Sequence, residues 1–148
     1  MATTFNLYDT WREEVGDPAR AAAIAGTLKI AWVTATYTPN QNTHDFFNDI
    51  TNEVTGTGYT AGGNACATPT WTLDGSGNLV FDASDPAAWT QNASGFANGR
   101  RAILYYDTGT PTTSRLVGYS NDTGADVGNV AADLELAFNA SGIYLAPR

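Results

Sequence analysis

The sequence contains very little histidine and cysteine. It contains one histidine, His44, and one cysteine, Cys66. A Ser-His-Asp or Cys-His arrangement would have to use His44, which stands in a polar stretch where we expect it to face solvent. Cys66 cannot form an internal disulfide and has no basic neighbour to lower its pKa, so we expect a small buried residue in a protein made in a reducing cytoplasm.

Basic residues are also scarce. Seven Lys and Arg stand against fifteen Asp and Glu, a net charge of −8, and residues 30–99 contain no Lys or Arg. Because nucleic-acid binding needs a basic face, this balance argues against a nucleic-acid partner. No apolar run approaches the ~20 residues of a membrane span and no secretory signal is visible, so we expect no membrane association.

The length of 148 residues suits a single domain, 1–148, made of a helical N-terminal segment (1–26) and a β domain (27–148). Large apolar residues recur near the start at steps of three or four, as on one helix face: Phe5, Tyr8, Trp11 and Val15. We therefore predict a helix from Phe5 to Val15 that Gly16 ends. Asp17 and Pro18 predict the start of a second short helix, which would run to Gly26.

After Thr27 the apolar period changes from helical to two, which is typical of strands. The predicted strands are 27–33, 67–73, 79–82, 101–107, 115–120, 133–138 and 143–145. The turn sequences D-G-S-G-N (74–78) and N-A-S-G (139–142) both predict hairpins. The fold class that follows is mainly β, an antiparallel sandwich or barrel of jelly-roll type.

A long connection, 37–63, interrupts the strands. Thr43 could cap one helical turn, and Phe46, Phe47 and Ile50 would anchor that turn to the core. The connection ends in G-T-G-Y-T-A-G-G, whose glycines suit turns with positive φ. Loops of this length are usually functional or disordered, so we expect it to contact a partner.

No group of residues predicts a catalytic or metal site. The acidic pairs Asp82 with Asp85 and Glu13 with Glu14 lack any sign of the facing geometry that glycosidases need. The oxygen-rich loops 74–78 and 121–126 do not match the twelve-residue calcium pattern, and ordinary turn chemistry explains them, although calcium stays open. We therefore expect no catalytic residues, no cofactor and no metal.

Aromatic residues on the predicted strands leave a carbohydrate-binding alternative open. They could form a sugar-stacking platform, although packing in the core or at a subunit interface is the simpler interpretation: Trp71, Trp89, Tyr105, Tyr106 and Tyr119. The element G-T-G at 56–58 lacks the flanking strand and helix of a dinucleotide site.

The order of several segments carries a resemblance to a known family. They are T-L-K-I-A-W-V-T (27–34), Y-T-P-N-Q-N-T-H-D (37–45), E-V-T-G-T-G-Y-T-A-G-G (53–63), F-D-A-S-D (81–85), R-A-I-L-Y-Y-D-T-G (101–109), S-R-L-V-G-Y (114–119) and D-L-E-L-A-F-N-A-S-G-I-Y-L (133–145). Together they resemble a family of small structural proteins of tailed bacteriophages and prophages. The Y-T-P-N and G-T-G-Y-T-A-G-G segments are the most specific, and the alanine-rich stretch 17–26 departs from the family's shorter connection.

The resemblance implies a non-enzymatic virion protein, made in the host bacterial cytoplasm. We expect a capsid cement or decoration protein on the capsid exterior that binds the major capsid protein and itself, as a homotrimer. The residues expected to contact these partners are aromatic: Phe5, Tyr8, Trp11, Tyr37, Phe46, Phe47 and Tyr59. Two alternatives stay open, namely another virion component (a neck, tail or head-fibre protein) and a carbohydrate-binding module or enzyme.

Overall fold

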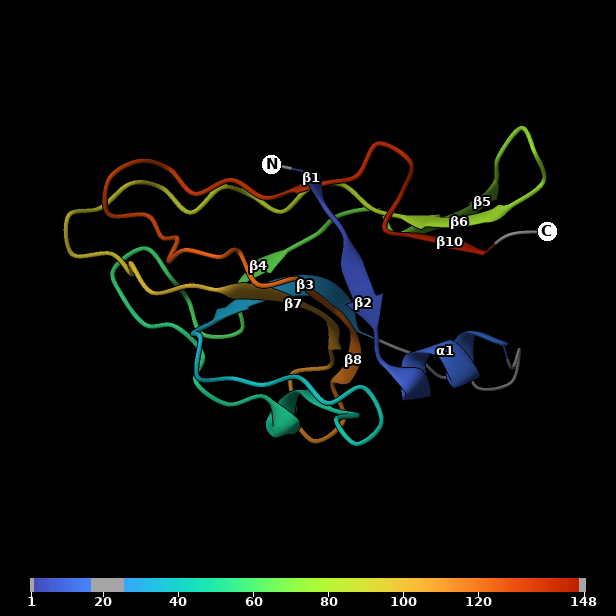
Figure 1. Cartoon of the computed structure of the whole chain (residues 1–148), viewed down its shortest axis with the longest axis horizontal. Helices are drawn as coiled ribbons and strands as arrows, with labels where there is room; N and C mark the ends of the chain where they lie inside the picture. The colour runs from blue at the N-terminus through green and yellow to red at the C-terminus, as the bar shows by residue number, and fades with distance from the viewer. Residues whose placement is uncertain (1, 17–25, 147–148) are drawn as a thin grey trace.

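The computed structural model describes residues 2–16 and 26–146, and Figure 1 shows their arrangement. The strands fall into three sheets. The five-stranded antiparallel sheet has the order β2 (Phe5–Leu7), β8 (Arg115–Ser120), β7 (Arg101–Asp107), β3 (Thr27–Val33) and β4 (Asn64–Ala65). A three-stranded sheet has the order β10 (Tyr144–Ala146), β6 (Leu79–Asp82) and β5 (Thr70–Leu73). The third sheet is the parallel pair β1 (Ala2–Thr3) with β9 (Ala137–Phe138).

The five-stranded sheet is buried on both faces, which explains why β3 and β7 are apolar at nearly every position. On one face Ile30, Trp32 and Leu104 pack with the chain segments above the sheet in Figure 1, among them β6 and β9. On the other face Val33 and Tyr105 pack against the long connection after β3. A sheet covered on both faces needs continuous rather than alternating apolar residues. The prediction of a mainly β, sandwich-like fold is therefore confirmed.

The helical prediction for the N-terminal segment is wrong over its first residues. Phe5 and Leu7 belong to β2, where they pair with Ser120 and Gly118 of β8. The period of two formed by these residues competes with the helical period, and the ladder to β8 decides the outcome. Helix α1 runs only over Asp9–Gly16. The predicted second helix falls on 17–25 and lies outside the described residues.

Several strand boundaries are confirmed and others need correction. Strands β3, β6, β7 and β8 match their predicted bounds. Strand β5 begins only at Thr70, because Thr68 adopts a positive φ of 48° and Pro69 follows. The 74–78 turn joins β5 to β6 as a hairpin. The 139–142 turn does not make a hairpin, because β9 pairs with β1 while β10 pairs with β6.

The predicted strand 133–138 is paired as a strand only at its end. Residue Leu134 forms an isolated bridge with Trp89, and the extended pairing is confined to β9. The expected alternation nevertheless holds, since Leu136 and Phe138 are buried while Asp133 and Glu135 are exposed. The side-chain pattern thus survives without a continuous ladder.

The long connection after β3 returns across the sheet and packs on it. It contains a single 3-10 turn, η1 (Phe47–Asp49), which Thr43 does not cap as predicted, since Phe46 occupies that position. Gly63, just before β4, has a φ of +71° and lies so close to β3 that a Cβ would stand 1.8 Å from the Ile30 carbonyl oxygen. A glycine is therefore required where this connection joins the sheet.

Candidate interaction surface

Four of the aromatic residues expected to bind a partner lie in the protein's own core. Phe5, Tyr8, Trp11 and Tyr37 are buried, with at most 7% of each residue exposed. Trp11 stacks on Tyr106 with ring centroids 5.6 Å apart. The fold therefore uses these rings in its own core. Sequence periodicity placed Phe5, Tyr8 and Trp11 on one face of a helix but could not say what covers that face.

The remaining three aromatic residues anchor the long connection to the sheet. Phe47 stacks on Tyr105 of β7 with ring centroids 4.1 Å apart. The Arg115 guanidinium lies 4.1 Å from the centroid of the Phe46 ring. The Tyr59 hydroxyl donates to Glu53 at 2.7 Å and accepts from the Trp32 backbone N–H at 3.0 Å. These contacts hold the long connection on the five-stranded sheet.

His44 does not face solvent freely as expected. Its Nδ1 lies 2.8 Å from the Tyr37 hydroxyl, and that hydroxyl lies 2.9 Å from the Tyr8 hydroxyl. Burial raises the pKa of Tyr37 to about 12 and raises that of Tyr8 further. The three side chains form a hydrogen-bonded row from the core to the half-buried imidazole. Each of the three side chains thus has a hydrogen-bond partner in the chain, and the row ties the long connection to the core.

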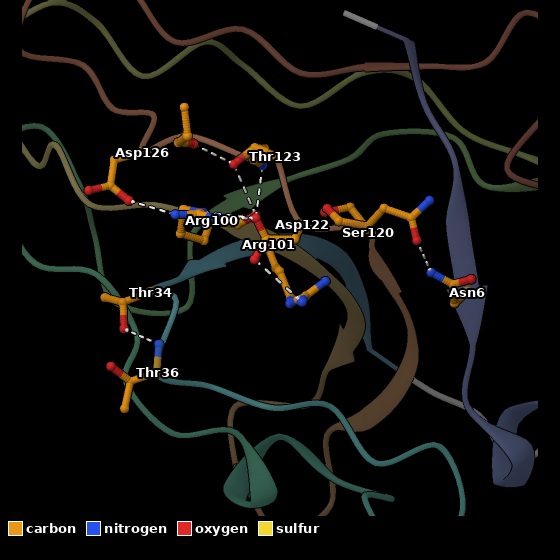
Figure 2. Close-up of polar contacts among 12 residues, drawn as sticks. Asn6, Thr34, Thr36, Arg100, Arg101, Ser120, Asp122, Thr123 and Asp126 are labelled. Atoms are coloured by element: carbon orange, nitrogen blue, oxygen red, sulfur yellow. Dashed lines mark hydrogen bonds and ion pairs between the residues drawn. The ribbon is translucent and has the colours of Figure 1, made fainter.

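Two consecutive arginines at the start of β7 hold the 121–126 loop (Figure 2). The Arg100 Nε donates to an Asp122 oxygen at 2.9 Å, and an Arg101 nitrogen lies 3.4 Å from the other oxygen. These bonds, above all that from Arg100, lower the pKa of Asp122. Asp126 also faces Arg100, at 3.5 Å. Both carboxylates of this loop therefore have cationic partners in the chain.

The cleft beside this cluster has a volume of about 270 Å³, and Trp32 lines it together with Ser120, Asp122 and Thr123. Several of its polar groups have partners in the chain, whereas the buried indole Nε1 of Trp32 has no hydrogen-bond partner among the described residues. The Ser120 hydroxyl accepts from the Ala102 N–H, and the Thr123 hydroxyl donates to backbone oxygens. We conclude that the two arginines brace the 121–126 loop against the start of β7.

The other polar residues singled out in the sequence also have structural contacts. Asp85 accepts a hydrogen bond from the Phe138 backbone N–H at 2.7 Å, and Asp82 accepts one from Ala83. Glu14 is buried beside Arg115, at 2.5 Å. Cys66 is 2% exposed, and burial raises the pKa of its thiol to about 12. Within residues 2–16 and 26–146 no cluster of three or more His, Cys, Asp or Glu side chains could hold a metal ion.

The aromatic residues considered for sugar stacking do not gather on one surface. Trp89 and Tyr105 are buried, and Tyr106 lies under Trp11. Trp71 of β5, by contrast, is 38% exposed. It stacks on Phe81 of β6 with ring centroids 4.8 Å apart.

Among the described residues, the large apolar side chains that are exposed all belong to the β5–β6 hairpin. They are Trp71, Leu73 and Leu79, and we call them the hairpin patch. Leu73 is 70% exposed and pairs with Leu79 across the hairpin. The three lie on the same face as Phe81, which is fully buried beneath Trp11. The apolar face therefore continues from the core outward into solvent.

The opposite face of the hairpin is polar and acidic. Thr72, Asp74, Val80 and Asp82 line an open hollow of about 340 Å³ together with the 140–142 turn. Hydrogen bonds from Asn78 and neighbouring backbone groups lower the pKa of Asp74, so its carboxylate stays charged. The hairpin patch could not be identified from the sequence. The alternation of Trp71 with Leu73 was visible, but only the fold shows that no described residue covers their outer ends.

Comparisons with protein families, with curated proteins and with solved structures found no match for this chain. Among the described residues no helix is long and apolar enough to cross a membrane. The geometry of the chain itself must therefore carry any functional conclusion, together with the resemblance drawn from its sequence segments.

Proposed function

We propose that this protein is a non-enzymatic structural component of a tailed-bacteriophage particle, a capsid cement or decoration protein. In this proposal it binds the outside of the shell formed by the major capsid protein, associates as a homotrimer and stabilises the head. The proposal starts from the sequence segments that resemble the phage structural family. It needs neither a catalytic site nor a cofactor.

The observation that supports it best is the hairpin patch. Monomeric soluble proteins seldom leave several large apolar side chains exposed side by side, and such patches mark interaction sites. Here the patch lies on a hairpin whose strand β6 pairs with β10, whereas β5 has no second strand beside it among the described residues. A protein repeated many times over a shell needs only a modest contact per copy, because the copies hold the shell jointly.

The experiment is a binding and counting assay on heads formed by the major capsid protein of the phage or prophage genome that encodes this chain. Purified protein is added to heads that lack it, and bound copies are counted by quantitative mass spectrometry. We expect saturation at hundreds of copies per head and a higher disruption temperature of the heads. Absence of binding would overturn the proposal.

The count also separates the main alternative. A neck, tail or head-fibre protein would be present in native particles at only about a dozen copies, as the symmetry of those parts requires. Such a count would replace the cement role by one of these positions.

A further inference from the structure

Strand β5 presents an open edge. Among the described residues it pairs with β6 alone. The Asp74 N–H donates to the Asn78 carbonyl at 2.9 Å, and the Asn78 N–H donates to the Asp74 carboxylate, so the Asp74 amide faces the β6 side of the hairpin. Because antiparallel pairs alternate, Thr72 also bonds to β6, whereas the backbone groups of Trp71 and Leu73 point away from it. The free edge thus offers two N–H groups and two carbonyls to an incoming strand.

Apart from its short length and the Pro69 that precedes it, this edge lacks the usual protection. Edge strands are generally guarded by short length, proline, charged side chains, bulges or a covering element. All four residues of β5, Thr70–Leu73, are uncharged and exposed. Pro69 stands just before the strand and so leaves the edge itself available.

The two faces beside the edge differ in chemistry. One carries the hairpin patch, which would receive apolar side chains. The other carries Asp74 and Asp82 around the hollow described above, which would receive basic side chains. Since side chains alternate between the faces of a strand, a complementary strand would alternate apolar and basic residues.

We propose that the open edge of β5 binds an extended segment of a partner protein in which apolar residues alternate with Lys or Arg. The segment adds to the sheet as a fourth strand, a mode in which main-chain bonds give affinity and side chains give specificity. This inference rests on the proposed function in one respect only, that the partner is the shell protein.

Charge argues against a second copy of this chain in the same place. Two antiparallel β5 edges related by a two-fold axis keep each face on the same side, so the acidic hollows of both copies would lie on one face. Asp74 and Asp82 of one copy would then approach those of the other. No Lys or Arg of residues 30–99 could compensate them.

The first test uses three seven-residue peptides with blocked ends: T-V-K-V-K-V-T, T-V-E-V-E-V-T and T-V-K-P-K-V-T. Acrylamide quenching of tryptophan fluorescence reports binding, because Trp71 is 38% exposed while Trp11, Trp32 and Trp89 are at most 2% exposed. The lysine peptide is expected to shield Trp71 and to bind about tenfold tighter than the glutamate peptide. The proline peptide should not bind. Equal binding by all three, or none by the lysine peptide, overturns the proposal.

The second test uses a matched pair of variants. Leu73→Ala and Leu73→Pro both remove the leucine side chain, but only proline removes the N–H at the open edge. We expect Leu73→Pro to abolish lysine-peptide binding and Leu73→Ala to weaken it a few-fold. Equal affinities for the two variants would show that no strand is added at the edge. Circular dichroism checks that each variant is folded.

A third variant keeps the inference testable if Leu73→Pro does not fold. Asp82→Asn retains the oxygen that accepts from Ala83 and removes one charge from the hollow. It should reduce the preference for the lysine peptide over the glutamate peptide, and an unchanged preference contradicts the basic pattern.

The same variants separate this inference from the proposed function. Peptide binding without head binding would overturn the cement role and leave the β5 site in place. Head binding that Leu73→Pro and Asp82→Asn leave unchanged would keep the cement role and overturn the site. If shielding of Trp71 instead grows with protein concentration and sedimentation shows a dimer that Leu73→Pro dissociates, the occupant is a second copy.

Discussion

The guanidinium of Arg115 lies 2.5 Å from a carboxylate oxygen of Glu14, and the same guanidinium covers the ring of Phe46. Arg115 on β8 thereby holds helix α1 on one side and the long connection on the other. Glu14 is 7% exposed, so the pair is largely removed from water. Loss of one partner from such a pair costs more than loss of both, because it leaves a buried charge.

Arg115→Met should therefore lower the free energy of unfolding by about 3–5 kcal/mol, since it takes the Arg115 guanidinium away from a glutamate that is only 7% exposed. The double variant Glu14→Leu with Arg115→Met should recover most of that loss. Urea unfolding followed by circular dichroism measures both. A double variant as unstable as Arg115→Met alone would show that packing on Phe46, and not the charge, is what matters.

Trp11→Ala should destabilise the isolated protein. The indole packs on Phe81 and Tyr106 and is 2% exposed, so its removal leaves a cavity between α1 and the two larger sheets. Substitutions of this kind cost about 3–5 kcal/mol. Chemical denaturation measures the change, and Arg12→Ala on the exposed side of α1 is the control. An unchanged midpoint would restore the earlier view of Trp11 as a residue kept for a partner.

Alkaline pH should unfold the protein, and its buried tyrosines should ionise as it unfolds rather than within the folded state. Burial raises the pKa of Tyr37 to about 12, and the pKa values of Tyr8, Tyr59 and Tyr105 are raised further. A group whose folded pKa exceeds the unfolded value of about 10 contributes stability below that value and loses it as pH rises. Stability should therefore fall between about pH 10 and 12.

Absorbance at 295 nm measures tyrosine ionisation, and ellipticity measures folding. We expect one cooperative step in both signals for the buried tyrosines. Ionisation of Tyr8, Tyr37, Tyr59 and Tyr105 near pH 10 with the fold intact would contradict this.

Cys66 should resist thiol reagents in the folded protein. Its thiol is buried and its pKa is raised to about 12, so almost no thiolate is present or accessible at neutral pH. Ellman's reagent should react with less than about 5% of the protein natively and with all of it in urea. Rapid native reaction would indicate local opening at the end of β4.

The sequence predicted the middle of the fold better than its ends. β3 and β7 are long, apolar and bounded by turn residues, so local pattern and tertiary pairing agree. Phe5 fits both a helical and an extended pattern, and its distant partner Ser120 decides between them. Local sequence cannot contain that information, because the ladder joins residues more than a hundred positions apart.

Burial and exposure at the candidate surface also depend on residues that are distant in the sequence. The aromatic residues were chosen as partner contacts from their size and their neighbours in the sequence, neither of which shows whether a side chain is buried. Burial of Tyr8 depends on Tyr37 and Tyr119, and exposure of Leu73 depends on the absence of a described neighbour beyond β5. The open edge could be predicted only once the order of strands was known.

The pairing of β1 with β9 and of β2 with β8 has a consequence for synthesis. Ala2 lies beside Ala137, and Phe5 beside Ser120. At about 5–20 residues per second a ribosome needs roughly 6–27 s to make the intervening chain. For that time Phe5 and Leu7 have no strand to join. Strands β8 and β9 must leave the exit tunnel before β2 and β1 can pair with them, so chaperones that shield apolar segments should affect the yield more than the final stability.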